Sequence, residues 1–331
     1  MTEPLSFLRR APWLRTKRPA HAFVLGRSRL TYVGPEKPTR VTAGTPPAVR
    51  VLSAPLPPEA FAEERSGVPV AGAAVAGAAA RLLAEAAVKM PAASLVVPDD
   101  FVHVLVVDVE DPDRHPKEVE EILTWKFGRT FGEPVPPLRL SWRSAGSGVS
   151  GTRVLALAVP EEAAASWEGP FEKAGIRIGA IEIEALAVAS LGAPAVGGNG
   201  LVLWAHGTTA TTAHFENGSL RFLRIRTASD ALSALSEVRL TAAYVAPPAA
   251  DEKGADGAAE EATSPLARIP CAAGPPGSAV FEAFIAFRAE HGGTPVTSLS
   301  PAVLLPGTRV ASGRPDGAEL LAALGAMAGG D

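Results

Sequence analysis

Two short turns carry the residue types that could bind a phosphate group. The first follows the apolar stretch AFVL and contains Gly26 and Ser28. The second follows GLVLWAH and contains Gly207, Thr208 and Thr209. Backbone N–H groups in glycine-containing turns form concavities that bind anions, and nearby hydroxyl groups add donors. The sequence therefore predicts two phosphate-binding turns in distant parts of the chain.

Both turns stand between expected strands. Residues 200–226 read as a strand, a small-residue turn, a second strand, a tight Asn217-Gly218 turn and a third strand. Residues 22–33 form a weaker copy, in which an apolar strand meets Gly26 and a second strand follows. Two such units far apart indicate an internal duplication. We therefore expect an α/β fold built from two related halves.

The bulk composition narrows the class of protein. The chain has 331 residues, 47% of them hydrophobic, and a net charge of −4. It is long enough for two domains and apolar enough to bury a core. Its negative charge argues against a general nucleic-acid binder, so no nucleic-acid partner is expected. The single cysteine, Cys271, excludes an intrachain disulfide, fits a reducing compartment and is expected to be a small buried side chain.

No targeting or membrane-spanning segment is expected. No stretch reaches the about 18 consecutive apolar residues of a membrane span. Arg9, Arg10 and Arg15 interrupt what would be the apolar core of a signal peptide, which favours a cytoplasmic protein. Residues 2–18 combine apolar side chains with five cations. Two interpretations of this segment stand side by side: a surface for an anionic membrane or a partner, and a solvated tail.

Composition shifts and expected elements divide the chain into parts. A strand, a helix, a hairpin and a second helix in the middle of the first half form a compact α+β insert. An acidic low-complexity stretch at 247–265 is expected to be disordered. The expected parts are a basic tail at 1–21, a first lobe at 22–98, the insert at 99–175, a return to the first lobe with a hinge at 176–196, and a second lobe at 197–331.

The succession of motifs resembles the PilM family of type IV pilus assembly proteins. HPKEVEEILTWKFGRTFGEPV is similar to the insert peculiar to that family, and LVLWAHGTTATTAHFENGSLRFLR to its second phosphate loop and hairpin. RIPCAAGPPGSAVFEAFIAF resembles its nucleotide-base region. The resemblance implies an actin-like (ribonuclease H-like) duplicated bilobed fold, with a small α+β insert in the first lobe and a reduced second lobe. The cytoplasmic part of the type II secretion L protein is the nearest competitor.

The chain departs from this pattern at the positions that matter for catalysis. Actin-like ATPases place an Asp two residues before the glycine of each phosphate turn, where it serves Mg²⁺, which needs hard oxygen ligands. The matching residues here are Val24 and Ala205. Pro275 and Pro276 also remove two N–H donors from the base-side turn. We therefore expect a degenerate site with no catalytic or metal-binding residues.

No cofactor is expected beyond weak ATP binding. The resemblance assigns that binding to the two phosphate turns and to the base-side turn. The expected nucleotide contacts are Gly26, Ser28, Gly207, Thr208, Thr209, Gly274 and Gly277.

The resemblance also implies a partner. In the PilM family the N-terminal tail of the inner-membrane protein PilN lies in a groove between the first lobe and the insert, and extended peptides are often captured in this way. We expect such a site near the strand at 101–108 and the helix at 116–128, with Trp125, Phe127 and Val104 as anchors. A core role for Phe127 is the equal alternative.

The function that follows is that of a cytoplasmic adaptor, associated peripherally with the inner membrane through a PilN-like partner. Pilus assembly ATPases are further candidate partners. The alternatives are an ATP-hydrolysing actin-like protein and a component of a type II secretion system.

One further motif, G-S-G-V-S-G at 146–151, matches the dinucleotide-binding pattern literally. That pattern requires a strand before it and a helix after it. A strand is expected to follow here, so we interpret the motif as a hairpin loop.

Overall fold

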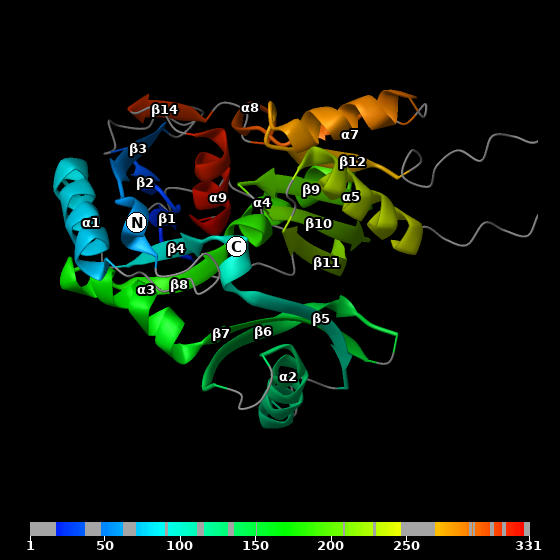
Figure 1. Cartoon of the computed structure of the whole chain (residues 1–331), viewed down its shortest axis with the longest axis horizontal. Helices are drawn as coiled ribbons and strands as arrows, with labels where there is room; N and C mark the ends of the chain where they lie inside the picture. Colours follow the sequence, from blue (N-terminus) through cyan, green and yellow to red (C-terminus); the bar gives the residue numbers. More distant parts are fainter. Residues whose placement is uncertain are drawn as a thin grey trace, which may run out of the picture. The chain divides into compact units, whose positions relative to one another are not determined.

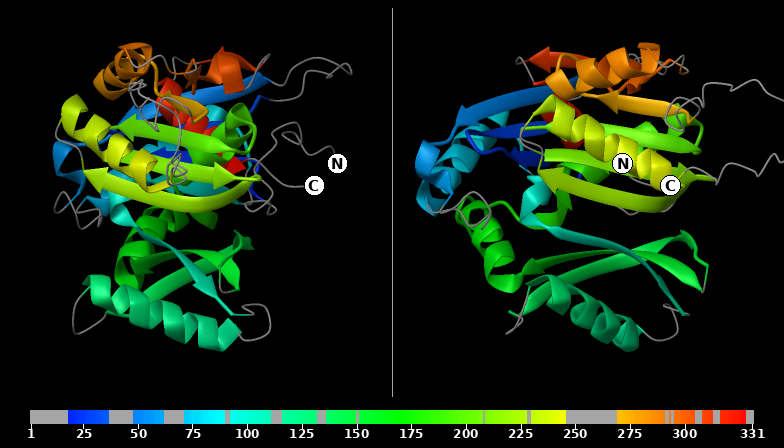
Figure 2. Two further views of the ribbon diagram at one scale, coloured as in Figure 1. Left: turned by 90° about the vertical axis from the view of Figure 1, so that its right-hand side faces the viewer. Right: turned by 45° about the vertical axis from the view of Figure 1, so that its right-hand side comes forward.

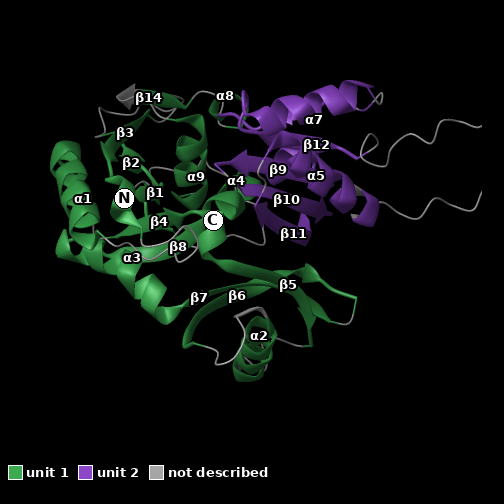
Figure 3. Ribbon diagram, viewed as in Figure 1, with its two compact units in different colours: residues 1–191, 301–331 green, residues 192–300 purple. Residues whose placement is uncertain are grey.

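The computed structural model divides the chain into two compact units (Figure 3). Unit 1 is Met1–Leu191 with Pro301–Asp331, and unit 2 is Gly192–Ser300. Most of the basic tail, Thr208 and the acidic stretch at 247–265 lie outside the described residues. The structure describes residues 18–36, 48–61, 71–89, 92–110, 116–131, 136–149, 151–207, 209–227, 230–245, 269–290, 293, 295–304, 308–312 and 316–327.

Unit 1 is built on a six-stranded mixed sheet in the order β14-β3-β2-β1-β4-β8 (Figure 1). β1, β2 and β3 form an antiparallel meander, whereas β4 and β8 extend the sheet from β1 in parallel. β14 pairs in parallel with β3 at the other end. The strands are β1 (Ala22–Leu25), β2 (Arg29–Pro35), β3 (Ala48–Pro55), β4 (Ala93–Val97), β8 (Ile178–Ile183) and β14 (Arg309–Ser312).

Helices cover this sheet on both faces. Every residue of β1 and β4 is buried, which a strand can achieve only when both of its faces are packed. Figure 1 shows α1 and α3 on one side of the sheet and α9 on the other. The helices of unit 1 outside the insert are η2 (Pro58–Ala60), α1 (Gly72–Ala86), η3 (Asp99–Phe101), α3 (Glu161–Lys173), α4 (Glu184–Gly192), α8 (Pro301–Leu304) and α9 (Gly317–Met327).

The C-terminal helix α9 belongs to unit 1, which corrects the expected second lobe at 197–331. All its residues from Ala318 to Met327 are buried, and the helix packs against β1, β2 and β4. Gly325 permits this packing, because a Cβ there would lie 2.2 Å from the carbonyl oxygen of Ala187 in α4. Asp316 caps the helix as expected, since its Oδ1 accepts a hydrogen bond from the N–H of Ala318 at 2.9 Å.

The insert is a three-stranded antiparallel sheet, ordered β5-β7-β6, with one helix (Figure 2). Its elements are β5 (His103–Val109), α2 (Pro116–Phe131), β6 (Leu138–Ser147) and β7 (Thr152–Pro160). Val119, Leu123 and Phe127 recur at helical spacing, so α2 buries one face against the sheet. The G-S-G-V-S-G motif begins at the end of β6, and its described residues Gly148, Val149 and Gly151 lie between β6 and β7, as a hairpin loop requires.

The insert is shorter than the expected 99–175. The helix α3 was expected to be part of it, but it packs mainly on α1 and also contacts β8 of the large sheet, while its start contacts β6 and β7 of the insert. Its buried Trp167 stacks on Phe101 with ring centroids 6.0 Å apart, and its Phe171 lies 5.1 Å from Phe23 of β1. These apolar contacts make α3 part of the cover of the six-stranded sheet.

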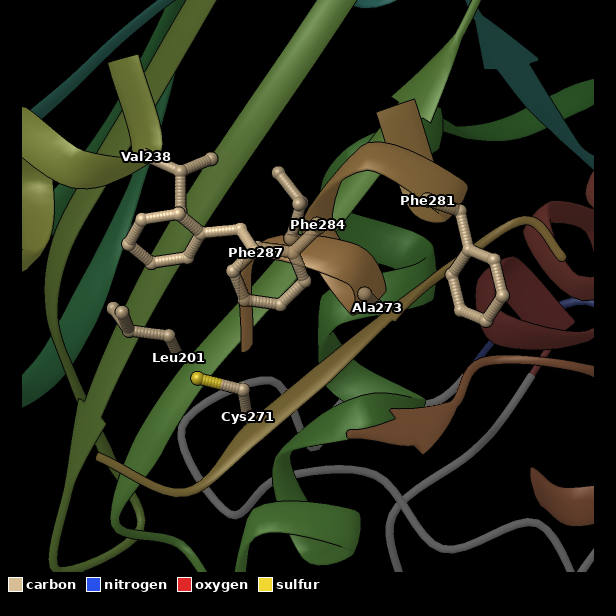
Figure 4. Close-up of a cluster of buried hydrophobic side chains, with 8 residues drawn as sticks. Leu201, Val238, Cys271, Ala273, Phe281, Phe284 and Phe287 are labelled. Carbon is tan, nitrogen blue, oxygen red and sulfur yellow. The ribbon is translucent and has the colours of Figure 1, made fainter. Parts of the chain in front are cut away.

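Unit 2 contains a five-stranded sheet in the order β11-β10-β9-β12-β13. A cluster of buried side chains from β9, β12, α5 and α7 forms its core, shown in Figure 4. The elements of unit 2 are η4 (Ala193–Val196), β9 (Gly200–His206), β10 (Thr209–Glu216), β11 (Ser219–Thr227), α5 (Ala231–Val245), β12 (Cys271–Gly274), α7 (Ala279–Glu290) and β13 (Thr297–Ser298).

The two sheets share one topology, as the expected duplication requires. In each unit the first three strands are antiparallel neighbours, and the fourth and fifth continue in parallel from the first. The Asn217-Gly218 turn between β10 and β11 is also confirmed: both residues have positive φ, 51° and 73°, as a type I′ hairpin requires. Among the described helices, none combines the length and the apolar character needed to cross a membrane.

Candidate functional site

The first expected phosphate turn connects β1 to β2. The N–H of Gly26 donates to the carbonyl oxygen of Arg29 at 3.0 Å, so this donor is used within the hairpin itself. The carbonyl oxygen of Ser28 accepts from the N–H of Leu56 at 2.8 Å, which holds the turn against the end of β3. Both contacts stabilise a closed hairpin, and the first of them uses a backbone N–H donor that an anion would otherwise accept from.

Carboxylates surround this turn. Arg27 pairs with Asp100, and Arg29 pairs with Glu319 at 2.5 Å and Asp316 at 2.9 Å. The hydrogen bond to Glu319 is the main cause that raises the pKa of Arg29 above its ordinary value. The two guanidinium groups are thus matched by three carboxylates. The local charge is negative and disfavours an added phosphate.

The second expected phosphate turn connects β9 to β10. Gly207 is exposed and has a φ of 60°, which suits the first position of a two-residue hairpin loop. His206 and Thr209 are paired across the loop. Thr208 lies outside the described residues. The turn is exposed at Gly207, but it is a two-residue β-hairpin loop rather than an extended glycine-rich loop.

The two glycines expected on the nucleotide-base side, Gly274 and Gly277, differ in their burial. Gly274, at the end of β12, is buried, and a Cβ there would lie 2.8 Å from Leu299 and 2.9 Å from Trp204. This glycine therefore serves the packing of unit 2. Gly277 is exposed, with a φ of 81° and open space around its Cα.

The two residues expected at the carboxylate positions of an actin-like ATPase are buried and apolar. Val24 is 3% exposed in β1, and Ala205 is 6% exposed in β9. Ala205 packs with Ala210 and Ala234 in a small apolar cluster. Neither side chain can coordinate a cation or orient a water molecule. In the part of the chain that the structure describes, no three His, Cys, Asp or Glu side chains form a group that could hold a metal ion.

A groove lies between the insert and the large sheet of unit 1. Its cavity volume is about 90 Å³, well below the ~300 Å³ typical of small-molecule sites, so its size suits side chains of a peptide. β8 and β6 form its two sides, and each is an edge strand of its sheet within the described residues. The groove is lined by Arg18, Val102, Arg139, Ser141, Arg143, Leu157, Ala158, Val159, Ile181, Glu182, Ile183 and Leu186.

Three arginines and one glutamate give the groove charged rims around an apolar floor. Arg18 and Glu182 form a salt bridge at 3.3 Å, with both side chains less than a tenth exposed. Arg139 pairs with Glu161 at 2.5 Å and Glu168 at 2.7 Å, and these hydrogen bonds raise its pKa above the ordinary value. Fixed charges beside an apolar floor can orient a peptide, while its apolar side chains supply the burial.

The predicted anchors lie in different places. Val104 is half-buried on β5 opposite Leu157, so both point to the face of the sheet that borders the groove. Phe127 is fully buried in the core between α2 and the opposite face of that sheet, which is the core alternative. Trp125 is 63% exposed on the outside of α2. Neither aromatic residue lines the groove.

A signal for the groove was present in β7. Its sequence TRVLALAV is apolar at successive positions. Val154, Ala156 and Ala158 face α2, whereas Leu157 and Val159 border the groove. A strand with two apolar faces needs cover on both. The insert supplies only one covering helix among the described residues, so the second face was open to another partner.

No protein-family model and no curated protein matches the sequence. Among solved structures, the chain is similar to a chain of the PilM-PilN type IV pilus biogenesis complex, with a TM-score of 0.66 and 17% identity over 94% of this chain and 98% of that one.

Two further structures are similar. A Bacteroides thetaiotaomicron protein with an actin-like ATPase fold and unknown function matches with a TM-score of 0.50 and 6% identity, over 87% of this chain and 93% of that one. The cytoplasmic domain of EpsL, an inner-membrane component of the Vibrio cholerae type II secretion system, matches with a TM-score of 0.45 and 10% identity, over 93% and 94%. At the identities of the two better matches the similarity establishes the fold. The chain has the actin-like α/β fold that the sequence predicts.

Proposed function

We propose that this chain is a cytoplasmic, actin-like adaptor of a type IV pilus inner-membrane platform. It captures the N-terminal tail of a PilN-like membrane protein in the groove between β6 and β8, and it does not hydrolyse ATP. Association with the inner membrane is peripheral and runs through this partner. The groove, in a chain that matches a PilM-PilN structure over nearly its whole length, is the observation that carries the proposal.

The architecture of the groove supports capture of an extended segment. Edge strands present unpaired backbone N–H and C=O groups, and an added strand can pair with them. The floor formed by Leu157, Ile181 and Ile183 offers burial to apolar side chains of the segment. Alternate residues of an extended peptide point to one side, so pockets of this size select apolar residues at every second position.

The degenerate turns support the absence of hydrolysis. Phosphoryl transfer depends on positioning and on neutralising charge with Mg²⁺. Val24 and Ala205 offer no ligand, and the carboxylates around the first turn repel a polyphosphate. A protein that keeps the actin-like fold but lacks the side chains that bind Mg²⁺ is suited to binding another protein.

Binding is tested by titrating the chain with a fluorescent peptide that has the sequence of the PilN-like N-terminal tail. We expect saturable binding that weakens by about tenfold or more in Ser141→Trp. Ser141 is exposed on β6 opposite the groove-lining Leu157, so the added ring occupies the groove without disturbing a core.

Ser144→Trp is the matched control. Ser144 is exposed on the same strand, but it is paired with Val154 on the α2 side of the sheet, so this variant should bind the peptide as the wild type does. Absence of binding at high micromolar peptide would contradict the proposal. Equal losses in the two variants would place the peptide elsewhere than in the groove.

A further inference from the structure

The β1–β2 turn, the first of the two expected phosphate turns, already lies against an anion that belongs to the chain itself. This anion is the carboxylate of Glu319, in the first turn of α9. Glu319 is 4% exposed, and its Oε1 lies 3.6 Å from the position that a Cβ on Gly26 would take. A carboxylate oxygen therefore packs beside the glycine of the turn, where the backbone carries no side chain to keep it away.

Donors from β2 converge on this carboxylate. The Nε of Arg29 donates to Oε1 at 2.5 Å, and the hydroxyl of Thr31 donates to Oε2 at 2.7 Å. The hydroxyl of Ser53, at an exposed position of β3, lies 2.9 Å from the Thr31 hydroxyl. Because a hydroxyl has one proton, Thr31 that donates to Glu319 accepts from Ser53. A guanidinium N–H and a hydroxyl that each reach one oxygen of the same group form a donor set suited to a small oxyanion.

We propose that Glu319 is a built-in ligand, whose carboxylate fills the anion position of the β1–β2 turn in place of a free anion. This role of Glu319 rests on one part of the proposed function, the absence of ATP hydrolysis, and is independent of peptide capture. A phosphate is excluded because the position is filled and because Asp100 and Asp316 add negative charge close by. α9 thereby supplies to the turn the contact that a bound ligand would otherwise supply.

A comparison with Asp316 shows why Glu319 is more than a surface ion pair. Asp316 is 39% exposed, pairs with the Nη2 of Arg29 at 2.9 Å and caps α9, which is the ordinary arrangement of an acid at a helix start. Glu319 is buried, and one of its two oxygens accepts from Thr31, which is fully buried. Of the two acids, Glu319 alone places both carboxylate oxygens on donors of the β2 strand.

Chemical rescue tests this role in the full chain. Glu319→Ala removes the carboxylate and leaves the donors of Arg29 and Thr31 facing the vacated space. Formate carries the same two oxygens and should bind there. At about ten times its Kd, formate should raise the Tm of this variant by about 2–4 °C more than sodium chloride does at equal ionic strength. The rise should saturate, as binding to a single site requires.

Three variants and the wild type serve as controls. The wild type and Glu319→Gln, in which the amide fills the same space, should gain nothing from formate beyond the effect of chloride. Arg29→Ala/Glu319→Ala lacks the charged donor, so most of the gain should be lost. Glu85→Ala removes an exposed carboxylate of α1 and should behave like the wild type.

Circular dichroism reports whether each variant is folded. If Glu319→Ala does not fold in chloride, the readout is the folded fraction recovered as formate is added, which should follow the same saturable curve. No gain in either readout, an equal gain in Glu319→Gln, or the full gain in Arg29→Ala/Glu319→Ala would each overturn the proposal. Such a result would leave the adaptor function standing, because peptide titration and calorimetry with Mg-ATP test that function separately.

Discussion

Thr31 and Glu319 lie 288 positions apart, yet the hydroxyl of Thr31 donates to Oε2 of Glu319 at 2.7 Å. Arg29 donates its Nε to the other oxygen of the same carboxylate. Glu319 is 4% exposed, so this carboxylate ties the start of α9 to β2 inside unit 1. The bond joins α9, late in the sequence, to β2, near its start, and it lies close to the β1–β2 turn that was predicted from the sequence to bind a phosphate.

Removing this carboxylate should destabilise unit 1. In Glu319→Ala the hydroxyl of Thr31 and the Nε of Arg29 each lose the hydrogen bond to Glu319, which should lower the free energy of unfolding by about 2 kcal/mol, while Arg29 keeps its ion pair with Asp316. The loss stays at this modest level because Arg29 is 40% exposed and water screens its charge. Urea unfolding measures it. Glu85→Ala, at an exposed position of α1, should change the same quantity by less than about 0.5 kcal/mol.

The two aromatic residues of α2 should respond oppositely to truncation. Phe127→Ala opens a cavity in the core of the insert and should cost about 3 kcal/mol or more. Trp125→Ala removes an exposed ring and should cost less than about 0.5 kcal/mol at low protein concentration. Hydrogen exchange of the amides of β5, β6 and β7 reports the loss locally. Similar protection in both variants would contradict the assignment of Phe127 to the core.

Calorimetry with ATP should give no heat that depends on magnesium. The residues at the two carboxylate positions, Val24 and Ala205, cannot serve as ligands of the metal. The informative comparison is ATP with Mg²⁺ against ATP with a chelator, together with a titration of Mg²⁺ alone. A binding isotherm seen only with the metal would contradict the adaptor interpretation.

Cys271 should resist alkylation in the folded protein. Burial in the core of unit 2 raises the pKa of its thiol to about 11, and the side chain is 3% exposed (Figure 4). The reactive thiolate is therefore scarce and shielded near neutral pH. Mass spectrometry after iodoacetamide treatment should find an unmodified chain under native conditions and one adduct in guanidinium chloride. Rapid native modification would show that this core opens.

Stability should fall as the solution becomes mildly acidic. Burial lowers the pKa of His21, His103 and His214 below the ordinary value of 6.5. The unfolded chain then binds more protons than the folded one as the pH falls through about 6.5, so stability is full above that pH and declines below it. Urea midpoints at about pH 7.5 and about pH 5.5 measure the effect.

His21→Asn provides the check on this pH dependence. His21 is buried, and its Nδ1 lies 2.9 Å from the hydroxyl of Tyr32. The substitution removes one of the three groups, so the difference between the two midpoints should shrink relative to the wild type. A wild type that is equally stable or more stable in acid would contradict the prediction.

Features that depend on neighbouring residues could be predicted from the sequence. The strand–turn–strand units and the Asn217-Gly218 hairpin follow from local periodicity and turn chemistry. The apolar residues at Val24 and Ala205 could be recognised once the turns were identified. The amphipathic pattern of α2 predicted its buried face. It could not distinguish a core residue from a partner-binding residue at Phe127, because both roles require an apolar side chain.

The tertiary structure decided what depends on residues far apart. The groove joins β6 and β7 of the insert to β8, and no single one of these segments shows by itself which of its faces stays open. α3 joined the cover of the large sheet through Phe171 and Phe23, and α9 returned to unit 1 through Glu319 and Thr31. The amino-acid sequence by itself determined which segments are apolar, where they turn, and that Val24 and Ala205 precede the two glycine turns. Only the packing of those segments decided which faces meet, because burial is a property of pairs of surfaces rather than of single residues.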